Sequence, residues 1–142
     1  MSVMQTPEGR IDIRQLSIVL GQGSEAFEAV RELDCQIEPG QFVCILGPSG
    51  CGKSTLLGAL AGHLSAHAGS LKVDGGEVSG PSPQRGMVFQ HHTLFPWRTV
   101  RDNVAFGLKM RGVGRAEREK IAHEYLALAK LTEAAARYPN EL

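Results

Sequence analysis

Two stretches near the start of the chain alternate apolar and polar residues. Ile11 and Ile13 stand between polar neighbours in the first stretch, and Leu33, Cys35 and Ile37 do so in the second. A period of two is typical of a β-strand, and the Pro-Gly step at residues 39–40 marks a turn. The pattern therefore predicts two strands, with a turn after the second.

A buried strand, a glycine-rich loop and a helix are predicted in that order over residues 41–62. The strand is expected over residues 41–46, because its FVCIL run is continuously apolar, as in strands buried on both faces of a parallel sheet. Glycines follow at once. Residues 53–62 (KSTLLGALAG) have the composition of a helix, with Gly62 at its left-handed cap.

The second half of the chain changes from strand patterns to helix patterns. Residues 70–78 predict a hairpin, because Asp-Gly-Gly at 74–76 follows an alternating run, and residues 86–90 (GMVFQ) predict a further strand. After Pro96, residues 99–110 and 115–131 favour helix. The Gly-Val-Gly step at residues 112–114 is the expected break between these two helices.

Composition and charge restrict the class of protein. A chain of 142 residues with 42% apolar and 21% charged residues fits one globular domain. Fifteen basic and fifteen acidic residues cancel, which argues against a nucleic-acid partner. The longest apolar run is far shorter than the roughly 20 residues of a membrane-spanning helix, and residues 1–10 lack the apolar core of a secretory signal. We expect a cytoplasmic chain whose membrane role requires another subunit.

The glycine-rich segment carries the clearest chemistry. Residues 47–54 (GPSGCGKS) fit G-x-x-x-x-G-K-[ST] at every fixed position, a match that chance would produce with a probability of roughly one in a hundred. Glycines let successive N–H groups turn inward around phosphate oxygens, and the next helix adds the positive end of its dipole. Lys53 supplies a charge to the outer phosphates, and the Ser54 hydroxyl is a ligand for Mg²⁺.

Two longer segments resemble the ABC transporter ATPases. GQFVCILGPSGCGKSTLLGALAG is similar to the Walker A region of that family, and GMVFQHHTLFPWRTVRDNVAFGL is similar to its Q-loop region. The resemblance implies an α/β fold: a partial P-loop NTPase (RecA-like) core, an antiparallel β subdomain and the beginning of the helical subdomain. Within one nucleotide-binding domain over residues 1–142, it places the β subdomain and Walker A at about 8–90 and the start of the helical subdomain at about 91–142.

The resemblance also implies a set of site residues. Lys53 and Gln90 would be catalytic, and Ser54 and Gln90 would bind Mg²⁺, although Gln90 could also be an ordinary glutamine at a strand end. The adenine ring would contact either Leu20 or Phe27, and Phe27 could equally be core packing. The residues expected to bind ATP are Gly47, Pro48, Ser49, Gly50, Cys51, Gly52, Lys53, Ser54 and Thr55.

The family's function supplies the expected partners. Such a subunit binds and hydrolyses ATP at the cytoplasmic face of the cell membrane, together with a transmembrane permease, a second nucleotide-binding subunit (a homodimer in the full-length protein) and, indirectly, a solute-binding protein. Pro96-Trp97 resembles the importers of nitrate, sulfonates and taurine. The transported solute itself stays open.

The last residues of the chain help to show which catalytic motifs the 142 residues contain. Residues 138–142 (YPNEL) resemble the residues before the family's signature motif, and the 142 residues contain no signature, Walker B strand or switch histidine. We therefore expect the chain alone to be inactive as an ATPase. The alternative function is a truncated, non-catalytic nucleotide-binding remnant. A small kinase is a third possibility, without an acceptor or lid motif in the sequence.

Overall fold

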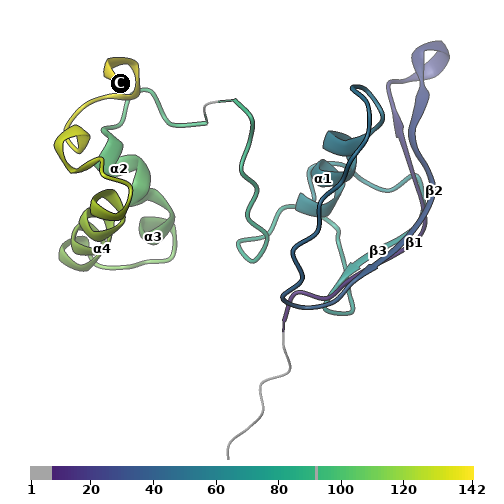
Figure 1. Ribbon diagram of the computed structural model, residues 1–142, viewed down its shortest axis with the longest axis horizontal. Helices are drawn as coiled ribbons and strands as arrows, with labels where there is room; N and C mark the ends of the chain where they lie inside the picture. The colour runs from purple at the N-terminus through teal and green to yellow at the C-terminus, as the bar shows by residue number, and fades with distance from the viewer. Residues whose placement is uncertain (1–7, 92) are drawn as a thin grey trace, which may run out of the picture. The chain divides into compact units, whose positions relative to one another are not determined.

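A computed structural model describes residues 8–91 and 93–142 (Figure 1). The expectation about a secretory signal therefore falls largely on residues 1–7, which lie outside the described residues. Two compact units divide the chain between Val88 and Phe89. Each unit is described by itself below.

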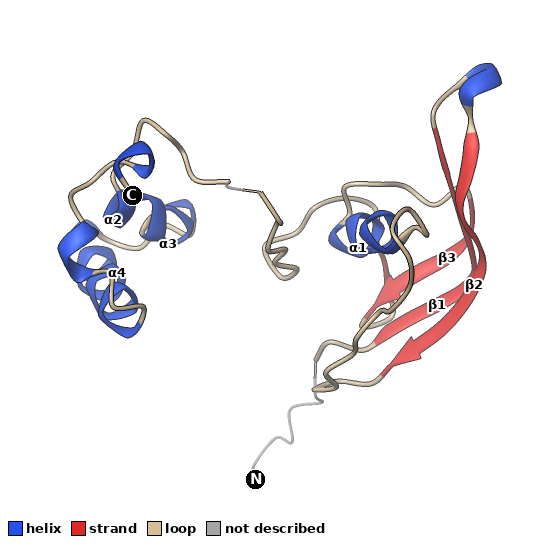
Figure 2. Cartoon of the chain, turned by 45° about the horizontal axis from the view of Figure 1, so that its top comes forward, coloured by secondary structure: helices blue, strands red, loops and turns tan. Residues whose placement is uncertain are grey.

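Unit 1 is an antiparallel sheet with one long helix beside it (Figure 2). The sheet has four strands in the order β2-β1-β3-β4, and every neighbouring pair is antiparallel. Its elements along the chain are β1 (Ile11–Leu20), η1 (Gly23–Glu25), β2 (Phe27–Ile37), α1 (Lys53–Ala61), β3 (Ala68–Val73) and β4 (Gly76–Glu77). The two alternating stretches at the start of the chain are thus confirmed as strands, as are the helix from Lys53 and the hairpin after Ser70.

The core of unit 1 lies between the sheet and α1. Leu16 and Ile18 of β1 are almost completely buried, and they cluster with Leu71 of β3 and Ala59 of α1. Burial of such side chains contributes about 1.5–3 kcal/mol each. The amphipathic pattern of β1 therefore fixes which face of the sheet carries the helix.

The α1 helix ends where the sequence predicts. Gly62 has φ 85° and ψ 15°, and its N–H donates to the Ala59 carbonyl oxygen at 2.9 Å. A Cβ at Gly62 would overlap the Gly80 carbonyl group. Glycine is required here both by the left-handed backbone and by the close approach of a second segment.

Two predicted strands are absent, which corrects the sequence analysis. Residues 41–46 and 86–90 belong to no strand, although both are apolar. Phe42, Leu46 and Val88 are 94%, 90% and 98% exposed. A strand forms only when its N–H and C=O groups pair with a neighbour, and the sheet of the described residues offers none to these segments. The prediction was wrong because an apolar run indicates only that its side chains favour burial. It does not indicate that a partner strand is present.

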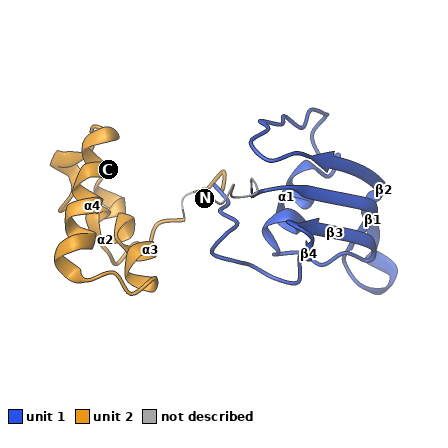
Figure 3. Cartoon of the chain, turned by 90° about the horizontal axis from the view of Figure 1, so that it is seen from below, with its two compact units in different colours: residues 1–88 blue, residues 89–142 orange. Residues whose placement is uncertain are grey.

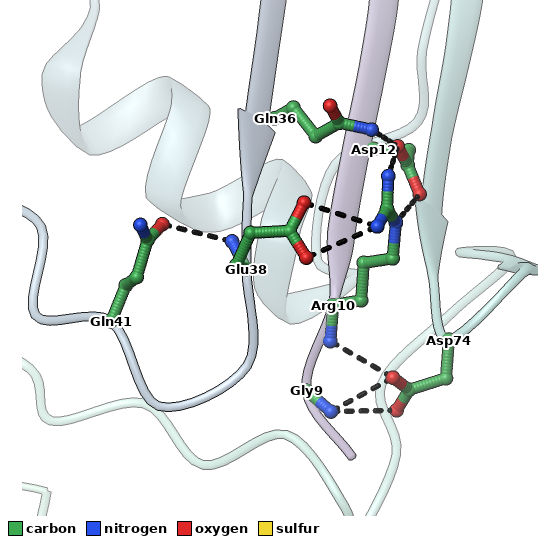
Figure 4. Close-up of polar contacts among 7 residues, drawn as sticks. All are labelled: Gly9, Arg10, Asp12, Gln36, Glu38, Gln41 and Asp74. Carbon is green, nitrogen blue, oxygen red and sulfur yellow. Dashed lines mark hydrogen bonds and ion pairs between the residues drawn. The ribbon is translucent and has the colours of Figure 1, made fainter. Parts of the chain in front are cut away.

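A polar network joins the start of β1 to the end of β2 (Figure 4). The Arg10 guanidinium donates to the Asp12 carboxylate at 2.9 Å and to Glu38 at 3.1 Å, and Gln36 donates to Asp12 at 2.6 Å. The hydrogen bond from Arg10 holds the pKa of Asp12 below its usual value. Exposed pairs of this kind add little stability. They join Glu38, the first residue after β2, to the start of β1.

Unit 2 is helical (Figure 3). It contains α2 (Val100–Val104), α3 (Phe106–Met110), α4 (Arg115–Leu128), η2 (Thr132–Ala134) and η3 (Pro139–Glu141). Its buried apolar residues are Val100, Ala105, Ala122 and Leu126. The helix predicted over residues 99–110 is interrupted at Ala105, and the predicted break at residues 112–114 is confirmed.

Candidate functional site

The glycine-rich loop runs directly into α1. Gly50 and Gly52 have φ values of 80° and 91°, in the left-handed region that glycine adopts without strain. Gly52 is the N-cap residue of α1, and no side chain caps it. The loop is exposed from Gly47 to Cys51. An exposed backbone that turns in this way presents N–H groups on its concave side, as anion-binding loops do.

Lys53 is folded back over this loop. Its Nζ atom donates to the carbonyl oxygens of Gly47 at 2.9 Å and Pro48 at 2.6 Å, and it lies 3.5 Å from Cys51 Sγ. These contacts keep a positive charge at the loop. Carbonyl oxygens carry only partial negative charge, so phosphate oxygens are stronger acceptors for the same ammonium group.

The first turn of α1 adds further donors. The Gly52 carbonyl oxygen accepts from the Leu56 N–H at 2.9 Å. Among the described residues no acceptor is recorded for the N–H groups of Lys53, Ser54 and Thr55. The first N–H groups of a helix have no partner within it, and the helix dipole makes them favour an anion. The loop and the helix start therefore fit a phosphate group, and the exposed Ser54 hydroxyl beside them fits a Mg²⁺ ligand.

The expected site residues divide between the two units. Residues 47–55 are contiguous at the start of α1 in unit 1, whereas Gln90 is exposed and belongs to unit 2. The roles of Lys53 and Gln90 in catalysis, and of Ser54 and Gln90 in binding Mg²⁺, stay predictions from the sequence.

The two candidates for contact with adenine lie opposite each other. Leu20 at the end of β1 pairs with Phe27 at the start of β2. Leu20 packs against the core of unit 1, whereas Phe27 is 60% exposed. The alternative that treats Phe27 as core packing is therefore wrong.

The loop is anchored on β2 at Gly52. A Cβ atom on Gly52 would overlap the Ala29 carbonyl oxygen and lie 3.4 Å from a methyl group of Val30. From the sequence motif alone, glycine is needed at position 52 only because the loop backbone turns sharply. The structure adds that Gly52 lets the loop approach the backbone of β2, two residues beyond Phe27.

We predict that Gly52→Ala destabilises unit 1 more than Gly50→Ala. Both replacements place alanine at a positive φ, at a cost of about 1 kcal/mol. Only Gly52→Ala adds the overlap with Ala29, since a Cβ at Gly50 meets no atom within 4 Å, and overlaps of this kind cost about a further 1–3 kcal/mol. Urea denaturation measures both losses. Equal losses in the free energy of unfolding would contradict the anchoring of the loop on β2.

Asn103 holds the turn before α2 in place. Its side chain accepts from the Phe95 N–H at 2.7 Å and donates to the carbonyl oxygens of Phe95 at 3.1 Å and Thr99 at 3.0 Å. Thr99 caps α2 by accepting from the Asp102 N–H at 3.2 Å. The T-V-x-D-N sequence thus fixes the turn that presents Pro96 and the exposed Trp97. A Thr followed by Asp three residues later is a recognisable cap signal, whereas the role of Asn103 has no local signature.

Comparisons with known proteins show the family of the chain. The ABC transporter family model matches residues 30–142. The nitrate import ATP-binding protein NrtD of Synechocystis sp. is 45% identical over 132 residues, which cover 93% of this chain and 50% of the relative. The taurine import ATP-binding protein TauB of Chromobacterium violaceum is 48% identical over 122 residues, covering 86% of this chain and 46% of the relative. The chain thus spans about half the length of these relatives.

A solved structure has the same fold. The dimeric ATP-binding cassette MJ0796 bound to ADP and Pi has a TM-score of 0.82 and 30% sequence identity, and the match covers 93% of this chain and 62% of that one. This match confirms the expected α/β P-loop NTPase fold. With the family model covering most of its length, the chain belongs to the ABC transporter family of ATP-binding proteins.

Proposed function

We propose that this chain is the nucleotide-binding part of an ATP-binding subunit that drives the import of a small solute. The observation that carries the proposal is the loop at residues 47–52, with Lys53 Nζ at 2.9 Å from the Gly47 carbonyl oxygen. Within the described residues, the N–H groups of Lys53, Ser54 and Thr55 at the start of α1 have no backbone acceptor. The names of the relatives support import, since they are nitrate and taurine import ATP-binding proteins.

In this role each element of the loop has a defined task. The Lys53 ammonium exchanges its contacts with the Gly47 and Pro48 carbonyl oxygens for contacts with the outer phosphates. The N–H groups at the start of α1 bind the inner phosphate oxygens. Mg²⁺, when bound, neutralises phosphate charge, and Ser54 and Gln90 would hold it. Lys53 and Gln90 are the residues we propose to act in catalysis.

Phe27 is our proposed contact for the adenine ring. It is 60% exposed, and it lies two residues before Ala29, whose carbonyl group touches the loop at Gly52. Two residues of strand span about 7 Å, which is within the length of a nucleotide. Leu20 lies opposite Phe27 on β1 and packs against the core of unit 1.

The proposed partners follow the same subunit type. They are a transmembrane permease, a second nucleotide-binding subunit and, indirectly, a solute-binding protein, at the cytoplasmic face of the membrane. The dimeric state of the similar cassette MJ0796 supports pairing of two subunits. In the part of the chain that the structure describes, every helix is too short or too polar to cross a bilayer. For the solute, we propose nitrate, a sulfonate or taurine.

We further propose that residues 1–142 alone bind ATP without turning it over. The sequence holds Lys53, Ser54 and Gln90 but no Walker B carboxylate, signature motif or switch histidine. In the alternative function, a non-catalytic nucleotide-binding remnant, the same residues bind ATP. The two functions differ in whether further residues complete the catalytic site in the cell.

A chimera tests the proposed function. Residues 1–142 replace the corresponding half of the taurine import ATP-binding protein of Chromobacterium violaceum, in cells that lack their own copy of that protein. We expect taurine uptake that requires ATP and that is lost in the Lys53→Ala chimera. Uptake equal to that of cells without any subunit, from a chimera that accumulates and co-purifies with the permease, would contradict the proposal.

A further inference from the structure

A polar cavity lies in unit 2 and contains no residue of the glycine-rich loop. It has a volume of about 270 Å³ and is lined by residues of α2, α3, α4 and the turn before α2. Its lining includes five cationic side chains, Arg98, Arg101, Lys109, Arg115 and Arg118, and two carboxylates, Asp102 and Glu119. The five cations exceed the two carboxylates by three charges, whereas the whole chain has no net charge. We call this cavity the basic pocket.

Arg98 is positioned by aromatic rings rather than by an acid. Its guanidinium carbon lies 5.3 Å from the centroid of the Phe95 ring and 4.8 Å from that of Phe106. Asn103 fixes the backbone beside it by donating to the Arg98 carbonyl oxygen at 3.2 Å. No ion pair of Arg98 occurs within residues 8–91 and 93–142. An arginine held over ring faces keeps its in-plane N–H donors for other acceptors.

The remaining cations converge on the same cavity. Arg118 is half-buried and donates to the Val113 carbonyl oxygen at 3.3 Å, while Arg115 pairs with Glu119 at 2.9 Å. The pKa of Glu119 is lowered, first by the hydrogen bond from Arg115 and further by the charges of Arg101 and Arg118. One carboxylate thus lies in the field of three guanidinium groups. Lys109 has no acidic partner among the residues that the structure describes.

The size of the cavity limits what it can hold. A volume of 270 Å³ is below the roughly 300–1,000 Å³ of pockets for whole cofactors, so it suits one anionic group. A multivalent oxyanion matches both the charge excess and the forked geometry of arginine donors.

We propose that the basic pocket binds a phosphate or similar tetrahedral oxyanion, either as the free ion or as part of a lipid headgroup. Bound there, the anion links α2, α3 and α4, which stabilises unit 2. None of the residues of the basic pocket belongs to the loop proposed to bind ATP, and the proposal does not depend on the assignment of that loop.

The test is a calorimetric titration of the full chain with inorganic phosphate at low ionic strength. All measurements use a Lys53→Ala background, which weakens anion binding at the glycine-rich loop equally in every variant compared. We expect Arg118→Gln to weaken phosphate binding about tenfold or more, since it removes a charge-assisted contact. Lys120→Gln, a neighbouring α4 residue that does not line the cavity, is the matched control and should leave the affinity unchanged. Lys109→Gln provides a second variant if Arg118→Gln does not fold.

Vesicles distinguish the two sources of the anion. Binding to phosphatidylglycerol vesicles but not to phosphatidylcholine vesicles, weakened by Arg118→Gln and not by Lys120→Gln, would support a lipid headgroup. Phosphate binding that is weakened by Arg118→Gln and not by Lys120→Gln, without binding to either kind of vesicle, would support the free ion. The proposal is overturned if Arg118→Gln and Lys109→Gln both bind as Lys120→Gln does in the phosphate titration and also in the vesicle assay.

Discussion

Purified residues 1–142 will release phosphate from Mg-ATP several orders of magnitude more slowly than a complete ATP-binding cassette. Phosphoryl transfer depends on groups that position the attacking water and neutralise charge together. In the proposed function, Lys53 and Ser54 at the start of α1 would form one side of such a site. In that proposal the second side is missing, because residues 1–142 hold no signature motif or Walker B carboxylate.

The assay compares this chain with its Lys53→Ala variant and with the chimera carrying a complete second half. We expect phosphate release from the chain to equal that of the variant, and release from the chimera to exceed both. Steady turnover by residues 1–142 that is lost on Lys53→Ala would contradict the proposal. It would mean that the chain, or a copy of it, supplies a catalytic carboxylate that we have not identified.

The Lys53→Ala substitution will weaken ATP binding by roughly tenfold to a hundredfold. A charge-assisted hydrogen bond to phosphate contributes about 1.5–3 kcal/mol, and Lys53 is the cation that the structure places over the loop. Calorimetric titration of ATP measures the loss directly.

Lys72→Ala is the matched control for that titration. Lys72 is a lysine of the same unit, on β3, and it pairs with Glu77 at 3.4 Å rather than with the loop. We expect the control to bind ATP as the unaltered chain does. An equal affinity for ATP in the folded Lys53→Ala variant would remove the basis for treating residues 47–55 as the nucleotide site.

Local signals in the sequence predicted most elements of the fold. The αL glycine at Gly62, the Asp74-Gly75 turn and the alternation around Ile13 each depend on the conformational preference of a few neighbouring residues, and each lies where the sequence places it. The fixed spacing of the P-loop motif likewise located the start of α1, because loop and helix are adjacent in sequence.

Features that depend on distant partners could not be predicted in the same way. Residues 41–46 have the composition of a buried strand, but strand formation requires a neighbour that these residues do not meet in the described sheet. Phe27 lies opposite Leu20, and this register depends on irregularities in the pairing of β1 with β2 that no pattern in the sequence indicates. The basic pocket is a further case, since Arg98 and Arg118 come together only when α4 packs on α2.

The rate of alkylation of Cys51 tests most directly whether the loop holds nucleotide. Cys51 is an exposed free thiol within the loop, whereas Cys44, also an exposed free thiol, lies before it and serves as an internal control. Labelling with iodoacetamide is followed at both residues by peptide mass spectrometry, with and without saturating Mg-ATP. We expect Mg-ATP to slow the labelling of Cys51 and to leave that of Cys44 unchanged. Labelling of Cys51 at the same rate under both conditions would contradict binding of nucleotide by the loop.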